Sequence, residues 1–368
     1  MNSYHKAVVD IIKKVQSFFE STFVSINVDG PKLDPEALGR EPLMLVSTHR
    51  SHVDYFLLGY VFNSIGLKNL RFAAGDNLTS LPWIGPRFKA FGAFPVSRDT
   101  GFDRHYVRNL CNDVVGMLEK GDTVLVFPEG GRSYSGAMLE MRIGVLGASV
   151  IAQAHDLSRD VRYIPVAVSY DCPPDAPWFN MQIKGKRLRK HSNPLHKRLI
   201  GNMLYFGADI AAFVPLLLAK YFRKKYGRIY VDYGEPVSIR SIMDVEANRT
   251  AVSRDEFSSH RVSMQSLGEK VYGQLSSLYR LLPVHIVAAQ LQAYRRRSLT
   301  DCADLFPSMI ADLRSRGKNV KELQKFTSAE NAQTGIAQLL KLGAVTYRRN
   351  VCTVRNEALV RYFAAAAG

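Results

Sequence analysis

Histidine and aspartate side chains occur together just after an apolar run near residue 47. The run LMLVS (43–47) predicts a buried strand, and HRSHVDYFLL (49–58) follows it. In a regular helix with about 100° per residue, His49 and Asp54 would point about 140° apart. We therefore expect His49 in the turn before the helix and Asp54 in its first turn, where the carboxylate can orient the imidazole. Such a pair is a general base that can deprotonate a hydroxyl group.

Two other interpretations of this cluster stay open. The same polar residues would suit a helix start that is only capped by local hydrogen bonds. A zinc site is disfavoured, because HRSHVD offers two histidines but no third strong ligand at metal-site spacing. The prediction is a His–Asp pair without a metal.

A second polar cluster follows the strand-like run TVLVFP (123–128). It consists of Glu129, Gly130, Gly131, Arg132 and Ser133. Adjacent glycines let a backbone approach an anion closely, and an arginine can bind phosphate through two parallel hydrogen bonds. The alternative is a turn that merely requires positive φ. Neither G-x-S-x-G nor GxxxxGK[ST] is present, which disfavours a nucleophile-elbow hydrolase and a P-loop enzyme.

The stretch GAFPVSRDTGFDRHYVRN (92–109) contributes further basic residues between these clusters. Arg98, Arg104 and Arg108 stand where a strand is expected to give way to a helix. They would face the same cleft, or else remain solvated surface charges.

Four strings in a fixed order resemble a known family. HRSHVD, GAFPVSR, FPEGGRSYSG and YIPVAVSYD are similar to the four sequence blocks of the glycerol-3-phosphate and acyl-glycerol-phosphate acyltransferases. The likeness covers about residues 44–171, and VDYGEP at 231–236 extends it. Within that family the chain looks most like the bacterial membrane-associated glycerol-3-phosphate 1-O-acyltransferases and the dihydroxyacetone-phosphate acyltransferases.

The resemblance implies a role for each matching residue. His49 would be the general base and Asp54 its partner, and Pro165 would help form the acyl-donor side. The residues that would bind the acceptor phosphate and shape the site are Arg98, Glu129, Gly130, Gly131, Arg132 and Ser133. One departure concerns the second block, which reads Ser97-Arg98 where relatives often carry two arginines, so one phosphate contact would be weaker or come from elsewhere.

The implied reaction moves a fatty acyl group from acyl-CoA or acyl carrier protein to glycerol-3-phosphate, the first step of phospholipid synthesis. Acceptors left open are 1-acylglycerol-3-phosphate and dihydroxyacetone phosphate. Acyl transfer from a thioester requires a base, a phosphate-binding group and an oxyanion donor, so no cofactor or metal is expected.

The pattern of apolar runs predicts the strands and helices that position the candidate site residues. Between about 40 and 240, short β-rich runs alternate with helical stretches, which is typical of an α/β domain with a mixed, largely parallel sheet flanked by helices. Residues 1–39 predict an amphipathic helix and a linker, and 241–368 predict a small, mainly helical C-terminal domain. The tail predicts a helix, two short strands and a helix.

Composition favours a polyanionic partner. Among 368 residues, 49 Lys and Arg against 33 Asp and Glu give a formal charge of +16. A basic run, KGKRLRK, precedes an apolar stretch that is interrupted by Asp209 and Pro215. This order favours contact with an anionic membrane through Lys184, Lys186, Arg187, Arg189 and Lys190. The alternatives are a solvated loop and an ordinary buried helix.

We expect a peripheral protein on the cytoplasmic side of the membrane. The first 20 residues lack the apolar core and cleavage site of a signal peptide, and the four cysteines have no CxxC spacing. The charge would also suit a nucleic-acid-binding protein, but no RNP, KH or zinc-finger pattern is present. A catalytically silent lipid-binding scaffold is disfavoured because His49, Asp54, Glu129 and Arg132 are all retained.

Overall fold

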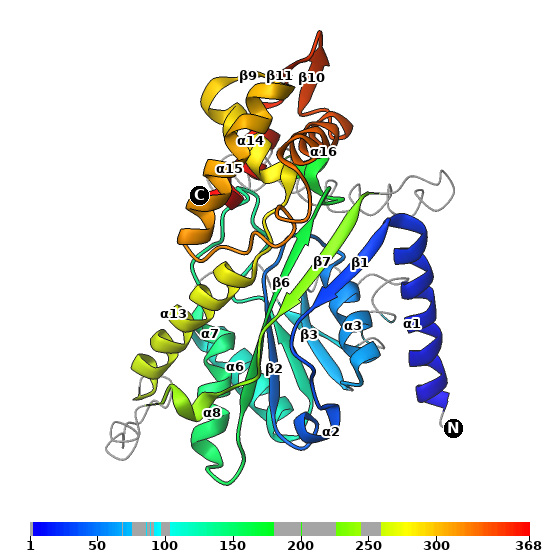
Figure 1. The fold of residues 1–368 in the computed structure, drawn as a ribbon. Coiled ribbons are helices and arrows are strands. Elements are labelled where there is room, and N and C mark those ends of the chain that lie inside the picture. Colours follow the sequence, from blue (N-terminus) through cyan, green and yellow to red (C-terminus); the bar gives the residue numbers. More distant parts are fainter. Residues whose placement is uncertain are drawn as a thin grey trace.

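A mixed sheet flanked by helices forms the body of the protein in the computed structural model (Figure 1). The structure describes residues 3–67, 69–75, 92–96, 104–179, 226–243 and 259–368, with the single residues 86, 89 and 200. Strands are β1 (Ser25–Asp29), β2 (Leu43–Ser47), β3 (Leu70–Gly75), β4 (Ala93–Val96), β5 (Thr123–Val126), β6 (Arg162–Tyr170), β7 (Arg228–Tyr233), β8 (Val237–Ser238), β9 (Arg296–Ser298), β10 (Val345–Arg348) and β11 (Val351–Val354). The longer helices are α1 (Ser3–Thr22), α3 (Asp54–Ile65), α6 (Arg104–Glu119), α8 (Ala148–His155), α13 (Arg261–Leu278), α14 (Pro283–Tyr294), α15 (Leu299–Ser315), α16 (Ser328–Lys341) and α17 (Glu357–Ala364), and the short ones are α2 (Pro35–Leu38) and α7 (Ile143–Leu146).

The strand order of the main sheet is β1-β7-β6-β2-β5-β3-β4, with β8 beside β6. Strands β6, β2, β5, β3 and β4 are parallel, whereas β7 runs antiparallel to β6 and β1 runs parallel to β7. These pairings confirm the predicted mixed, largely parallel sheet. The carboxyl ends of β2, β5 and β6 therefore meet at one edge, where α/β proteins place their active sites.

Both faces of the sheet are covered, which explains the uninterrupted apolar run LMLVS. Leu43 and Leu45 face a core shared with α1 and α3, whereas Met44 and Val46 face a core shared with α6, α8 and α13 (Figure 1). All four side chains are at most 2% exposed. Packing on both sides thus fixes strand β2, and this also fixes the position at which the following turn begins.

Two segments lie differently from their sequence assignments. Strand β1 pairs with β7 inside the range 1–39 that was predicted as helix and linker. SINVD alternates over only five residues, too few for periodicity to identify a strand. Helix α13, assigned by sequence to the C-terminal domain, buries Met264 and Leu267 against the main sheet. An amphipathic helix shows the same period whichever core it covers.

The C-terminal region has its own core and lies above the carboxyl edge of the sheet (Figure 1). Its end follows the predicted order of helix, two strands and helix in α16, β10, β11 and α17. A third strand, β9, was missed because RRS is short and polar. The guanidinium of Arg280 attaches this region to the sheet by hydrogen bonds of 3.0 Å to Asp232 and 2.8 Å to Asp29.

Candidate active site

The turn between β2 and α3 carries His49. Strand β2 ends at Ser47 and α3 begins at Asp54, so His49 precedes the helix and Asp54 opens it. The Nδ1 atom of His49 lies 2.9 Å from Oδ2 of Asp54. The structure thus brings together the two residues that the sequence pairs.

Asp54 is held by donors on both of its oxygens. Besides the His49 contact, Oδ2 accepts the backbone N–H groups of Arg50 at 2.7 Å and Ser51 at 2.9 Å, and Oδ1 accepts the hydroxyl of Tyr170 at 2.5 Å. A carboxylate is an acceptor only, so His49 carries its proton on Nδ1 and its Nε2 presents a lone pair. This is the tautomer that a general base requires.

The imidazole of His49 lies in a pocket of aromatic rings. Its ring stacks on Phe127 with centroids 4.2 Å apart, and Nε2 is 3.3 Å from the hydroxyl of Tyr55. The side chain is only 5% exposed. Burial lowers the pKa of His49 and outweighs the opposing bond to Asp54, while Arg132 and His52 lower it further. His49 is therefore neutral, and able to take a proton, at neutral pH.

Glu129 supports this turn from the end of β5. One oxygen, Oε1, accepts the backbone N–H of His49 at 3.1 Å. The other, Oε2, accepts Nη1 of Arg50 at 3.2 Å and the backbone N–H of Leu139 at 2.9 Å. These contacts give Glu129 an internal role, in which it fixes the backbone of the candidate base.

Arg132 belongs to a second group of paired charges. Its Nη1 donates to Oδ2 of Asp175 at 2.8 Å and its Nη2 to the hydroxyl of Tyr134 at 3.0 Å. The same Asp175 oxygen accepts the backbone N–H of His52 at 2.8 Å and lies 3.2 Å from its Nδ1. Burial alone would raise the pKa of Asp175, but His52 and Arg132 outweigh it and hold that pKa well below its usual range. Asp175 is therefore ionised and joins the first cluster, through His52, to the second, through Arg132.

The turn at Gly130 and Gly131, here called the glycine turn, brings a further residue of the second cluster into contact with the first. The backbone N–H of Ser133 donates to the carbonyl of His49 at 3.3 Å. Gly130 has φ of 69°, and a Cβ there would overlap the side chain of Arg142. Gly131 has open space at its Cβ position. Only Gly130 of the pair is thus required by backbone geometry.

The remaining predicted residues divide into two groups. Pro165 is buried within β6 beside Val46 of β2, and its carbonyl accepts the N–H of Gly234 at 3.0 Å. Six other predicted positions lie outside the described residues: Arg98, Lys184, Lys186, Arg187, Arg189 and Lys190. Helix α6 includes Arg104 and Arg108.

Sequence reasoning missed four side chains of this site, namely Arg50, Tyr55, Tyr170 and Asp175. Arg50 is fully buried, with its guanidinium 5.0 Å above the ring of Tyr279. Burial alone would lower its pKa, but Glu129 outweighs that effect and raises it. The available signal was position: Arg50 adjoins the candidate base, Tyr170 lies within the fourth block, and Asp175 lies four residues after that block.

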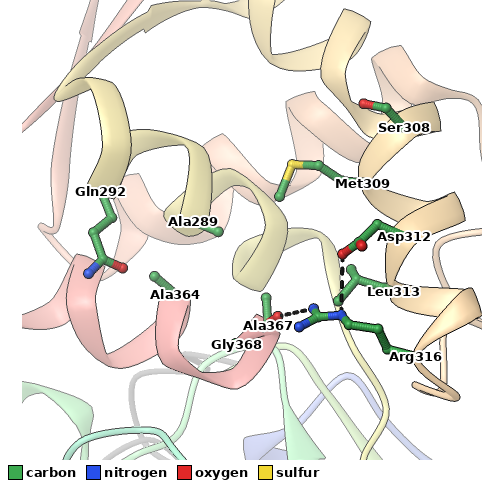
Figure 2. A pocket seen from close by; sticks show the side chains of 10 residues that line it. All are labelled: Ala289, Gln292, Ser308, Met309, Asp312, Leu313, Arg316, Ala364, Ala367 and Gly368. Atoms are coloured by element: carbon green, nitrogen blue, oxygen red, sulfur yellow. Dashed lines mark hydrogen bonds and ion pairs between the residues drawn. The ribbon is translucent and has the colours of Figure 1, made fainter.

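Two cavities of the described structure lie away from this site. One of about 500 Å³ opens between α14, α15 and α17, where Arg316 contacts Asp312 and the carbonyl of Ala367 (Figure 2). Another of about 430 Å³ lies between α1, β1 and α3. Neither is lined by His49 or Arg132. Buried, paired ionisable groups cluster at functional sites, and the group around His49 and Arg132 has this character.

The described ranges lack two other features. Those residues contain no group of three or more histidine, cysteine, aspartate or glutamate side chains that could hold a metal ion. Among the described helices, none combines the length and the apolar character needed to span a membrane.

Comparison with known protein families identifies both parts of the chain. Residues 25–169 match the family described as Acyltransferase, and residues 215–352 match the Glycerol-3-phosphate acyltransferase C-terminal region. The chain thus contains an acyltransferase domain followed by a glycerol-3-phosphate acyltransferase C-terminal region. The acyltransferase match runs from β1 to the last but one residue of β6 and includes His49, Asp54, Glu129 and Arg132.

Individual relatives match most of the length of this chain. A glycerol-3-phosphate acyltransferase of Actinobacillus pleuropneumoniae serotype 5b (strain L20) is 26% identical over 281 residues, which are 75% of this chain and 32% of the relative. One of Shewanella pealeana (strain ATCC 700345 / ANG-SQ1) is 26% identical over 335 residues, 84% of this chain and 39% of the relative. The chain therefore spans between about a third and two fifths of the length of these relatives.

A solved structure is also similar. It is the 1-acyl-sn-glycerophosphate (LPA) acyltransferase from Thermotoga maritima, with 17% identity and a TM-score of 0.36 over 73% of this chain and 83% of that chain.

Proposed function

We propose that this acyltransferase transfers a fatty acyl group from acyl-CoA or acyl carrier protein to a hydroxyl of glycerol-3-phosphate. The observation that carries the proposal is the buried His49–Asp54 pair, whose 2.9 Å contact leaves Nε2 as the basic nitrogen of His49. The match of residues 215–352 to the glycerol-3-phosphate acyltransferase C-terminal region, and relatives of that name, support glycerol-3-phosphate as the acceptor.

His49 acts first as base and then as acid. Its Nε2 takes the proton of the acceptor hydroxyl while the hydroxyl oxygen attacks the thioester carbonyl. The tetrahedral intermediate collapses to the ester, and the departing thiolate takes the proton back from Nε2. Asp54 stabilises the imidazolium that exists between these steps. The reaction uses no cofactor beyond the acyl donor.

Arg132 is the proposed phosphate ligand among the described residues, with Arg98 as its proposed partner. Arg132 lies in the same site as His49, since its charge lowers the pKa of that histidine. In the present structure its Nη1 is bound to Asp175, so the phosphate must share Arg132 with this carboxylate or displace it. Arg132→Lys should raise the KM for the acceptor far more than the KM for the acyl donor, because a lysine cannot bind bidentately.

The decisive experiment identifies the lipid product. Purified protein is incubated with palmitoyl-CoA, or with palmitoyl carrier protein, and with radiolabelled glycerol-3-phosphate, dihydroxyacetone phosphate or 1-acylglycerol-3-phosphate in separate reactions. We expect lysophosphatidate from glycerol-3-phosphate and much less product from the other acceptors. If 1-acylglycerol-3-phosphate or dihydroxyacetone phosphate gave more product, the proposed acyl transfer would stand, but the proposed acceptor would be wrong.

We also propose peripheral attachment to the cytoplasmic face of an anionic membrane. The support is the charge of +16 and the basic run that contains Lys184, Lys186, Arg187, Arg189 and Lys190. Each basic residue near an anionic surface contributes about 1 kcal/mol, and salt weakens that contribution.

Liposome co-sedimentation tests the attachment. Changing the five residues Lys184, Lys186, Arg187, Arg189 and Lys190 to Gln should reduce binding to vesicles that contain anionic lipid. The control changes five exposed basic residues of the C-terminal region to Gln, namely Arg296, Arg314, Arg348, Arg349 and Arg355. Equal losses in both variants would mean that only net charge matters, and equal binding to neutral and anionic vesicles would exclude an electrostatic attachment.

A further inference from the structure

Tyr170 is the last residue of β6 and contacts the catalytic pair from the neighbouring strand. Its hydroxyl donates to Oδ1 of Asp54 at 2.5 Å, across a sequence separation of 116 residues. Strands β6 and β2 are in parallel register, with Val166 opposite Ser47. Tyr170 therefore extends past the end of β2 to the level at which the turn and α3 begin.

The two oxygens of Asp54 have different partners. Oδ2 accepts three N–H groups, which belong to His49, Arg50 and Ser51. The hydroxyl of Tyr170 is the partner of Oδ1. A carboxylate can rotate about its last bond and exchange its oxygens, unless each oxygen has its own donor. The Tyr170 bond opposes that rotation and keeps Oδ2 directed at Nδ1 of His49.

The ring of Tyr170 is itself fixed. It is 2% exposed and lies 6.2 Å, centroid to centroid, from the ring of Phe23, just after α1. Burial first, and then the charge of Asp54, raise the pKa of Tyr170 well above its ordinary value. Asp175 and Tyr362 also face it and act in the same direction. The hydroxyl therefore keeps its proton and remains a donor throughout the neutral pH range.

We propose that Tyr170 is a positioning residue for acyl transfer, which acts on His49 through Asp54 and touches no substrate. Tyr170 lies one residue beyond the region that matches the acyltransferase family and before the second matched region. The proposal rests on the proposed role of His49 as the base.

Removal of the Tyr170 hydroxyl should change the pKa of His49. A residue that only packs against its neighbours would not have this effect. Without the Tyr170 bond, the negative charge of Asp54 is less compensated and attracts the imidazolium of His49 more strongly. The pKa of His49 then rises. The other groups that act on His49, Arg132 and His52, are unchanged. The acid limb of the pH–rate profile must move to higher pH, because a base works only when unprotonated.

Tyr170→Phe is the test variant, and Tyr163→Phe is its matched control. Tyr163 is on the same strand, is equally buried, and donates its hydroxyl to Gln274 at 2.7 Å on the α13 side. We expect Tyr170→Phe to lower kcat about 10- to 100-fold, the range for the loss of a hydrogen bond to a charged group. KM for both substrates should be nearly unchanged. Tyr163→Phe should keep the wild-type kcat.

Two further measurements separate positioning from structural damage. The kcat effect of Tyr170→Phe should vanish in an Asp54→Asn background, since the residue acts through that carboxylate. The pKa of His49, measured by nitrogen NMR of labelled imidazoles, should be higher in Tyr170→Phe than in the wild type and the Tyr163 control. This second readout needs no turnover, so it remains valid if the wild type fails to acylate glycerol-3-phosphate. An unchanged His49 pKa, or an equal kcat loss with and without Asp54, would overturn the proposal.

Discussion

The carboxylate of Glu129 lies 3.2 Å from the guanidinium of Arg50, and both side chains are at most 2% exposed. Glu129 comes from the end of β5 and Arg50 from the turn after β2, next to the candidate base. On its other side Arg50 covers the ring of Tyr279, beyond the end of α13. A buried ion pair therefore joins two strand ends of the sheet to the C-terminal region at the point where His49 is held.

Glu129→Gln should destabilise the protein as a whole. A buried charge that loses its partner costs about 3–5 kcal/mol, because Arg50 cannot regain water. Thermal unfolding should show a clearly lower Tm, whereas Glu140→Gln, at an exposed position in the same loop, should leave the Tm unchanged. An unaltered Tm combined with a higher KM for the acceptor would show that Glu129 is a substrate contact.

His49→Ala should lower kcat by about two to four powers of ten, the contribution typical of a positioned general base. His155→Ala is the control, since the His155 side chain is 40% exposed and its Nδ1 lies 2.8 Å from the carboxylate of Glu119. Steady-state kinetics on both variants, with circular dichroism to verify folding, give the comparison. Turnover of the His49 variant at the wild-type rate would exclude it as the base.

Gly136→Ala should displace α17 from the glycine turn. Gly136 has φ of 84°, and a Cβ there would overlap the backbone carbonyl of Tyr362. The strain and the clash together should cost more than about 1 kcal/mol. Gly116→Ala, near the end of α6, should be neutral or slightly stabilising, because no atom lies within 4 Å of the added Cβ. Denaturant midpoints measure both variants, and equal midpoints would mean that α17 does not pack here in solution.

His285 should make the protein sensitive to acid. Burial, followed by the charge of Arg50, lowers the pKa of His285 to about 3. An unfolded chain binds this proton below about pH 6.5. The contribution of His285 to stability is thus complete above pH 6.5 and is lost as the pH falls from 6.5 towards 3. Over that whole window the loss is about 4–5 kcal/mol.

His285→Gln tests this pH dependence. The variant should lose less stability than the wild type between pH 7 and pH 4, although its own stability at pH 7 is lower because Nδ1 no longer accepts the N–H of Leu282. His155→Gln, on the surface, should follow the wild-type curve. Parallel Tm curves for wild type and His285→Gln would assign the acid sensitivity to other groups.

The sequence predicted the features that depend on residues close together in the chain. LMLVS is apolar at every position but the last because both sheet faces are covered, and the turn that follows places His49 before the helix. Asp54 lies five residues away, so the pair is visible in a short string. The fold class follows from the same alternation of apolar runs and helical stretches.

Contacts between distant segments were not predictable in this way. Tyr170 reaches Asp54 only because β6 is nine residues long and in parallel register with β2, and neither fact can be read from the residues themselves. Asp175 meets Arg132 through the packing of a loop after β6. Arg50 was overlooked because arginine is usually exposed, and its burial depends on a carboxylate 79 residues away.

The pairing of β1 with β7 bears on the order of folding. Ser25 pairs with Arg228, so β1 leaves the ribosome long before its partner strand exists. Pairing between such distant segments is slow, because the intervening chain must lose its entropy first. A nascent chain that ends before residue 228 would therefore carry β1 unpaired, with its backbone N–H and C=O groups in water. In the finished fold β1 covers β7, and without it β7 would present an unpaired strand edge to other chains.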